Sequence, residues 1–246
     1  MKQFRILTTL YVAACTLVLF SCGGGEEKKA DEPGVAADTA VAKTTEPAAP
    51  APAAKPSNVL IIMHKVANFG KWMPLYESHD SVRQAYGLHN YVVARGVNDS
   101  NTVMIALRMD DAAKAKQFAA LPDLKTVMQK GGVKGVPSFK YLDVQMMDSS
   151  ANALPTRVLL THKVKDWDAW KKEFDSHKQV RIDAGLTDRA VAYSVGDNHQ
   201  VSVVCVVSDL KKAEAFFKSA DLKEKMTKAG VEGAPTIFYY NVVKKY

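Results

Sequence analysis

Cysteine is scarce in this sequence: the 246 residues contain only Cys15, Cys22 and Cys205. The first two lie in or directly after an apolar N-terminal run, so a folded domain further along would keep Cys205 alone. One thiol cannot form an intrachain disulfide, which excludes a disulfide-stapled fold. Cys205 lies within an apolar run, residues 201–207, and is predicted to be a small buried side chain and no nucleophile.

Motifs for several common chemistries are also absent. The sequence has no Ser-His-Asp or Cys-His arrangement, no phosphate-cradling glycine loop and no dinucleotide fingerprint. These absences argue against triad hydrolases and nucleotide-binding domains. The N-terminal apolar run, residues 6–20, is shorter than the roughly 20 residues that a membrane-spanning helix needs.

The N-terminus is typical of an exported bacterial lipoprotein. Lys2 and Arg5 precede the apolar run, and the letters LFSC at residues 19–22 resemble a lipobox. We therefore predict a signal peptide at residues 1–21, lipidation of Cys22 and a membrane partner through that lipid anchor. The expected location is the bacterial cell envelope, at the outer membrane, with the domain facing the periplasm or the surface. A plain secretory peptide with an incidental cysteine is the alternative.

The segment at residues 22–57 differs in composition from everything that follows. It is rich first in Gly, Glu and Lys and then in Ala, Pro and Thr, with almost no large apolar side chains. Such a segment cannot bury enough surface to offset its chain entropy. We predict that it is a disordered tether between the lipidated Cys22 and the folded domain.

The rest of the sequence is an internal duplication. The stretch HKVANFGKW that begins at His64 returns as HKVKDWDAW at His162, 98 positions later, and the register continues without a gap. A repeat of this length indicates two copies of one structural unit. We place the copies at residues 58–148 and 156–246.

Each copy has the pattern β-α-β-β-α-β, which defines a ferredoxin-like α+β unit. Asn68 and Asp166 are suitable N-caps for the first helices, and the helix of copy one is predicted to reach about residue 85. Gly87 and Gly185 suit the left-handed position that ends such helices. The strands of copy one are predicted at residues 59–66, 91–97, 103–109 and 137–144.

Two strands are apolar on nearly every residue instead of alternating, at residues 103–107 and 201–207. Such runs indicate strands that are buried on both faces. Because helices cover only one face of a ferredoxin-like sheet, the other face must pack against a second sheet. We predict that the two repeats pack sheet to sheet as a pseudo-dimeric α/β barrel within one monomeric chain.

This pattern resembles a known superfamily. The opening V-x-D-W-x-x-W at residues 164–170 and the closing G-V-x-G-x-P at residues 132–137 and 230–235 are similar to the dimeric α/β-barrel superfamily, in particular to antibiotic-biosynthesis-monooxygenase-like domains. The resemblance covers residues 58–246 and implies the barrel fold. It leaves the chemistry open, because the superfamily includes cofactor-free oxygenases, haem-degrading enzymes and isomerases.

The first helix of each copy carries the candidate site. Phe69, Trp72, Tyr76, His79 and Arg83 are spaced 3, 4, 3 and 4 apart, which places them on one face of a continuous helix. This face predicts a cavity between helix and sheet for a flat or anionic ligand. The alternative is that the stripe is ordinary core. The predicted ligand-binding residues are Trp72, His79, Arg83, Tyr141, Trp170, His177, Arg181 and Tyr239.

No metal or cofactor is predicted. His64 and His162 end the first strands and could meet the helix histidines, which would form a histidine pair. Neither copy offers a matched third ligand, such as a carboxylate on the same face, to complete a zinc or iron site.

The formal net charge of +7 bears on the expected partners. In an envelope protein it favours anionic small molecules, acidic lipid headgroups or polysaccharide, and no nucleic-acid partner is expected. Two functions stay open. One is a lipid-anchored module that binds a small anionic or aromatic ligand. The other is a cofactor-independent enzyme of the monooxygenase or isomerase type, with His79 and His177 as general bases.

Overall fold

The computed structural model describes residues 58–246. The predicted signal peptide, the lipidation site Cys22 and the predicted tether at residues 22–57 lie outside the described residues. Within residues 58–246, no helix is both long enough and apolar enough to cross a bilayer.

Both repeats contain four strands, and the first predicted helix of each is divided in two. Repeat one consists of β1 (Asn58–Val66), α1 (Phe69–Ser78), α2 (Asp80–Ala85), β2 (Leu88–Gly96), β3 (Thr102–Met109), α3 (Ala112–Ala119), α4 (Pro122–Lys130) and β4 (Val133–Met147). Repeat two consists of β5 (Thr156–Val164), α5 (Trp167–Ser176), α6 (Lys178–Asp183), β6 (Leu186–Ser194), β7 (Asp197–Val207), α7 (Leu210–Phe217), α8 (Ala220–Lys228) and β8 (Val231–Lys245).

The division of the first helix corrects the prediction of one continuous helix. It lies at His79 in repeat one and at His177 in repeat two, where ψ is 16° and 17°. These values depart from the α-helical ψ of about −42°. The His79 N–H therefore donates to the Tyr76 carbonyl only three residues back (3.3 Å), a tighter turn than the α-helix.

The helix boundaries that the sequence predicted are confirmed. Asn68 and Asp166 each accept a hydrogen bond from the backbone N–H three residues on, at 2.9 and 2.7 Å. Gly87 and Gly185 have φ of 66° and 77°, in the left-handed region that favours glycine. At Gly185 a Cβ would also lie 3.1 Å from the Asp209 nitrogen, so both conformation and space require glycine there.

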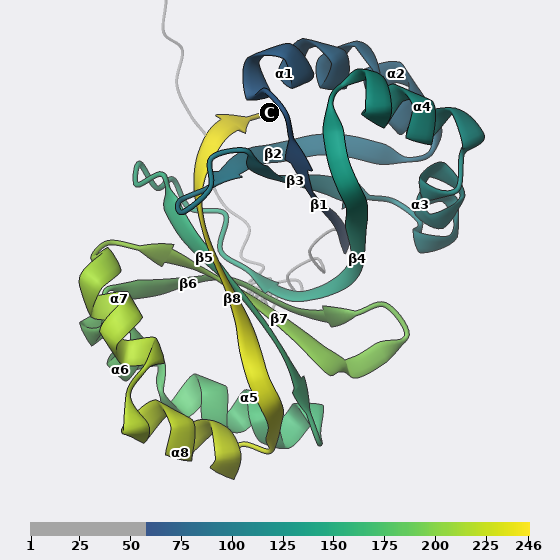
Figure 1. The fold of residues 1–246 in the computed structure, drawn as a ribbon. Helices are drawn as coiled ribbons and strands as arrows, with labels where there is room; N and C mark the ends of the chain where they lie inside the picture. Colours follow the sequence, from purple (N-terminus) through teal and green to yellow (C-terminus); the bar gives the residue numbers. More distant parts are fainter. Residues whose placement is uncertain (1–57) are drawn as a thin grey trace, which may run out of the picture. The chain divides into compact units, whose positions relative to one another are not determined.

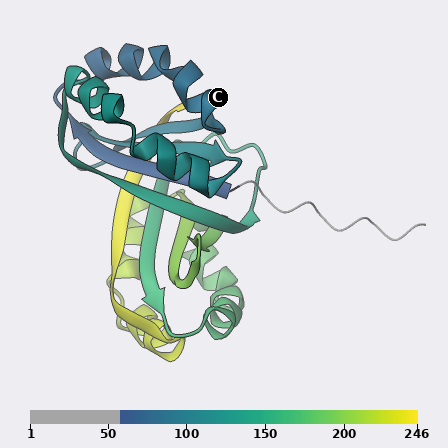
Figure 2. The same cartoon turned by 90° about the vertical axis from the view of Figure 1, so that its right-hand side faces the viewer.

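The strands form one closed antiparallel barrel in the order β1-β3-β2-β8-β5-β7-β6-β4 (Figure 1). Within each repeat the last strand lies beside the first, as in a ferredoxin-like sheet. The helices of each repeat cover the outer face of that repeat's own strands, on opposite sides of the barrel (Figure 2). The fold is therefore the predicted one, with two tandem ferredoxin-like repeats that form a pseudo-dimeric α/β barrel.

The repeats join at two seams, and each seam is made by a long last strand. The first part of β4 pairs with β1 of its own repeat, and the last part pairs with β6, where Val144 lies opposite Ala192. In the same way β8 pairs with β5 and then with β2, where Val242 lies opposite Ala94. The two seams have the same register, shifted by the length of the repeat.

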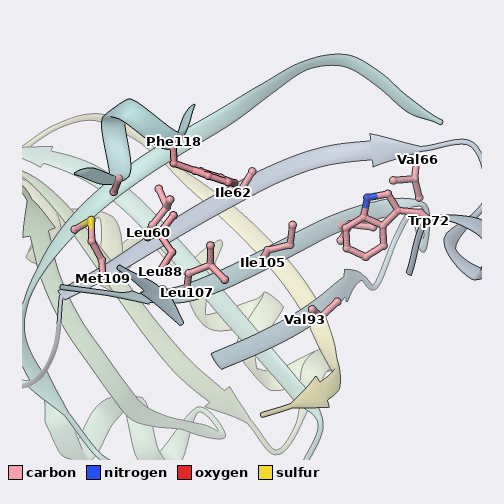
Figure 3. Packing of buried hydrophobic residues seen from close by; sticks show 12 residues of the cluster. Leu60, Ile62, Val66, Trp72, Leu88, Val93, Ile105, Leu107, Met109 and Phe118 are labelled. Atoms are coloured by element: carbon pink, nitrogen blue, oxygen red, sulfur yellow. The ribbon is translucent and has the colours of Figure 1, made fainter. Parts of the chain in front are cut away.

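Alternate residues of the central strands face two different cores. In β1, Leu60 and Ile62 face the helices and belong to the same buried cluster as Trp72 (Figure 3), whereas Val59 and Ile61 face the barrel interior. All five side chains are buried. The predicted run in β3 is divided in the same way, with Ile105 and Leu107 in the helix-side core and Met104 and Ala106 in the barrel interior. This double burial explains the lack of polar alternation and confirms the prediction made from it.

Expressing repeat one alone, residues 58–148, tests the closed barrel as the folding unit. The fragment would expose its share of the barrel interior and leave both seam edges unpaired, so we expect it to self-associate or aggregate. Residues 58–246 should instead form a monomer that unfolds in one transition. Size-exclusion chromatography with light scattering distinguishes the two, and a stable, soluble monomer of one repeat would contradict this expectation.

Candidate functional site

A cavity of about 370 Å³ lies between the helices and the sheet of repeat one. Its floor comes from β1 and β3, one wall from α1 and α2, and the opposite wall from α3 and α4. Most of the lining is apolar or aromatic, as is usual for small-molecule sites. The residues that define it best are Ile62, His64, Trp72, Tyr76, His79, Arg83, Ile105, Phe118, Leu124 and Met128.

The equivalent cavity of repeat two is much smaller, about 80 Å³. It is lined by the matching residues, among them His162, Trp170 and His177. Phe217 also lines it, at the position that Ala119 occupies in repeat one. A phenyl ring fills space that a methyl group leaves open, so the duplication retained two sites of similar composition and different capacity.

His64 is the most unusual group in the cavity of repeat one. Its side chain lies at the end of β1 on the helix-facing side, only 6% exposed, with its ring centroid 5.6 Å from that of Trp72. Neither ring nitrogen has a hydrogen-bond partner among the described residues. Leaving a buried polar group unpaired costs about 1–3 kcal/mol. The sequence indicated His64 only as a possible partner of the helix histidine and not as a ligand-binding residue, although the strand alternation that buries Leu60 and Ile62 could have placed it in the site.

Burial keeps His64 neutral. It lowers the pKa of this imidazole from 6.5 to about 4, and the pKa of His162 falls equally far for the same reason. A neutral imidazole has one N–H donor and one acceptor nitrogen. His64 therefore brings no charge to the cavity wall, and its donor and acceptor nitrogens, both enclosed by neighbouring side chains, are left unpaired.

His79 and His177 lie where the first helices are divided, and each lines the cavity of its repeat. The Nδ1 atom of His177 lies 2.7 Å from the Glu173 carbonyl oxygen. A carbonyl only accepts hydrogen bonds, so Nδ1 carries the proton and Nε2 is left as an acceptor. The His79 ring makes no hydrogen bond with the described residues, and this arrangement suits either ligand binding or proton transfer.

The Arg83 guanidinium is held by the protein itself. The side chain is 3% exposed and lies 3.9 Å above the Tyr76 ring. Its Nε donates to Asn90 (3.1 Å), its Nη1 to the Tyr76 carbonyl (2.7 Å) and its Nη2 to Asp80 (3.3 Å). The arginine thus supports the carbonyl at the break between α1 and α2, and no nitrogen is left without a partner.

Arg181 has the same role with a different counter-ion. Its Nε and Nη2 donate to the two oxygens of Asp188 at 2.8 and 2.6 Å, and its Nη1 donates to the Phe174 carbonyl at 2.6 Å. Each side chain of this ion pair is only 9% exposed. Cys205 lies against Asp188, and burial raises the pKa of its thiol, which agrees with the prediction of an unreactive side chain.

The predicted tyrosines lie outside the two cavities. The Tyr141 ring faces the Lys116 ammonium at 5.7 Å, and the Tyr239 ring lies 6.4 Å from that of Phe217. Burial raises the pKa of Tyr239 to about 12. Of the predicted set, the structure therefore brings Trp72, His79 and Arg83, and their counterparts in repeat two, to the cavities.

The described residues offer little to a metal. No group of three or more His, Cys, Asp or Glu side chains within residues 58–246 could hold a metal ion. Each cavity contributes two histidines, and the nitrogens of the strand histidine are enclosed by neighbouring side chains. The residues present therefore do not fit a metal ion held by protein side chains alone.

Because burial keeps His64 and His162 neutral down to about pH 4 in the folded chain, stability should fall in acid. Between pH 6.5 and 4 the unfolded chain binds protons that the folded chain does not, so the free energy of unfolding decreases as the pH is lowered through this range. We expect a loss of about 3 kcal/mol per histidine by pH 4. Urea unfolding should show this loss in the wild type and much less in the His64→Phe/His162→Phe variant. Parallel pH profiles would contradict it.

Several solved structures have a similar fold. A proposed monooxygenase of Fusobacterium nucleatum subsp. nucleatum is 15% identical, covers 76% of this chain and 93% of its own, and has a TM-score of 0.50. An anthrone oxidase-like protein is 14% identical over 77% of this chain and 92% of its own, also with a TM-score of 0.50. A proposed monooxygenase of Lactobacillus acidophilus NCFM is 11% identical over 76% and 94%, with a TM-score of 0.49.

At these identities the similarity concerns the fold alone. No family model matches the sequence, and no curated protein is significantly similar to it. The two matches with TM-scores of 0.50 each cover about three quarters of this chain. The described part of the chain has the dimeric α/β-barrel fold of monooxygenase-like proteins, built here from two repeats of one chain.

Proposed function

We propose that this protein is a lipid-anchored envelope module that binds a small, largely apolar aromatic ligand in the cavity of repeat one. The observation that carries the proposal is His64, a neutral and unpartnered imidazole in an apolar cavity of about 370 Å³. A ligand with one hydroxyl or carbonyl group would give His64 the hydrogen bond that the protein does not supply, once it displaces the side chains that enclose the ring nitrogens.

The surroundings of His64 favour an aromatic ligand over an anionic one. Trp72 stacks on Tyr76 with ring centroids 5.0 Å apart, which gives the cavity a rigid aromatic wall. Arg83, the cation in this wall, already donates from all three nitrogens. The cavity thus offers stacking and one neutral hydrogen-bonding group, but no free positive charge.

Repeat two serves mainly as a structural partner in this proposal. Its cavity of about 80 Å³ has room for little more than solvent, although it retains the histidine and the tryptophan. Its strands complete the barrel that holds repeat one. The proposal therefore predicts one ligand per chain and not two.

A second candidate is catalysis in the same cavity. The folds with TM-scores of 0.50 belong to a proposed monooxygenase and an anthrone oxidase-like protein, both named for oxidation reactions. In this reading His79, whose ring has no hydrogen-bond partner in the described chain, removes a proton from an aromatic substrate in a cofactor-independent reaction. Trp72 and Tyr76 would hold the substrate ring.

The ligand proposal can be tested with matched substitutions in the two repeats. His64→Phe keeps the ring shape but removes both nitrogens, so the ligand should be lost while stability is kept or improved. His162→Phe makes the same change in the small cavity and should leave the ligand in place. Native mass spectrometry of protein purified from its own host measures retention, and thermal unfolding measures stability.

The outcomes separate binding from core packing and from catalysis. A steep loss of melting temperature in His64→Phe, with the ligand retained, would contradict the site assignment. Consumption of the retained compound by the wild type would favour the enzyme. In that case His79→Gln should lower the rate by roughly 10²- to 10⁴-fold.

The membrane anchor is tested at Cys22. We expect Cys22→Ser to prevent acyl labelling and to release the protein from the membrane fraction, because serine has no thiol to carry the lipid. Metabolic labelling with a fatty acid and fractionation of the cells measure both effects. A Cys22→Ser protein that stays with the membrane would show that the lipoprotein interpretation is mistaken.

A further inference from the structure

A third cavity, of about 290 Å³, lies inside the barrel and is separate from the two helix-side cavities. Strands from both repeats line it, together with residues of the segment that joins β4 to β5. Several of its lining residues are pairs from equivalent positions, such as Val59 with Arg157 and Tyr91 with Arg189. The cavity therefore lies on the axis of local symmetry that relates the two repeats.

The chemistry of this cavity does not follow that symmetry. Repeat one supplies Met104 and Leu142, whereas repeat two supplies Ser202 and Tyr240 at the matching positions. The apolar residues of repeat one, Met104 and Leu142, belong to the hydrophobic core of the barrel interior. With Arg157 in place of Val59, three matched positions are thus polar in repeat two only, and Arg157 is the largest change. Packing alone does not require these polar residues.

Arg157 carries a charge that the described chain does not balance. Its side chain is 4% exposed, and its Nη1 donates to the carbonyl oxygens of Leu154 and Thr156. Its Nε and Nη2 have no hydrogen-bond partner, and it forms no ion pair with the described residues. Neutral carbonyls do not compensate a buried charge, which is costly unless it is paired. Burial accordingly lowers the pKa of this guanidinium.

Another arginine of this protein shows which group the Nε/Nη2 edge of a guanidinium binds. Arg181 uses the same two atoms, Nε and Nη2, to hold both oxygens of Asp188 at 2.8 and 2.6 Å. This edge of a guanidinium matches the spacing of the two oxygens in a carboxylate. Arg157 lines the barrel cavity, and its matching edge has no carboxylate partner in the described chain.

Other polar groups around the cavity are also suited to an anion. Ser202 and Tyr240 are buried there, and neither hydroxyl makes a hydrogen bond with the described residues. The half-buried Arg189 and the exposed Arg108 and Lys245 line it as well, and no Asp or Glu of the described chain does. Arg189 is partly balanced by Asp148 at 3.7 Å, outside the lining. The interior is therefore positively charged with free hydrogen-bond donors.

We propose that the barrel interior binds a small organic monoanion, a carboxylate with a short apolar body, whose carboxylate lies on the Nε/Nη2 edge of Arg157. The apolar body would pack on the repeat-one side, against Val59, Ile61 and Val144. These walls disfavour inorganic phosphate and polyphosphates, which need polar groups on every side. This site is independent of the aromatic site next to His64.

Octanoate and 1-octanol are suitable probes, since they share an alkyl chain and differ in charge. Isothermal titration calorimetry would use the full chain with Cys22→Ser, so that no acyl group competes. We expect one octanoate per chain and weaker binding of octanol. Arg157→Val, which installs the residue found at the matching position of repeat one, should weaken octanoate by about 10- to 100-fold and leave octanol unchanged.

Two further variants keep the test decisive. Ser202→Met also installs the repeat-one residue and should reduce octanoate binding by filling the cavity, even if Arg157→Val does not fold. His64→Phe should leave octanoate binding unchanged, because it alters the other cavity. No octanoate binding to the wild type, or equal binding to Arg157→Val, would overturn the proposal. Loss of octanoate in His64→Phe alone would also overturn it and would place the probe in the helix-side cavity.

Discussion

The structure depends on one constraint: helices cover only one face of each four-stranded sheet, and the other face is as apolar as the first. The second face is buried by closure, because β4 and β8 are long enough to pair first with their own repeat and then with the other. Pairing at both seams leaves no open sheet edge in the barrel and fixes which side chains point inward. Every cavity described above is a consequence of that register.

Closure also allows the two repeats to differ. Residues at matching positions share one barrel, so a change in one repeat is supported by strands that the other repeat holds in place. Phe217 in place of Ala119 fills the helix-side cavity of repeat two, and Arg157 in place of Val59 introduces a charge on one side of the interior. The duplication thus provides an internal comparison that separates what the fold needs from what one repeat has acquired.

The sequence was sufficient to predict features that depend on local chemistry. The caps Asn68 and Asp166, the left-handed glycines and the double burial of the central strands follow from single residues and short patterns, and all are confirmed. The helix break at His79 was not predicted, because it depends on a carbonyl that the Arg83 side chain holds from seven residues away. Arg157 was not predicted as a site residue, because the register of strand pairing at the seams decides whether a lone arginine on a strand faces solvent or the barrel interior.

A comparison of Arg83, Arg181 and Arg157 shows what gives a buried arginine a purely structural role. Arg83 is balanced by Asp80 with Asn90 beside it, whereas Arg181 has Lys178 and Asp188 at the two matching positions. The acidic partner occupies a different position in each repeat, but both arginines form an ion pair. The protein therefore neutralises a buried guanidinium even when the partner changes, as the cost of an unpaired buried charge requires. Arg157 is as deeply buried and has no such acid, so the charge that balances it has to come from outside the described chain.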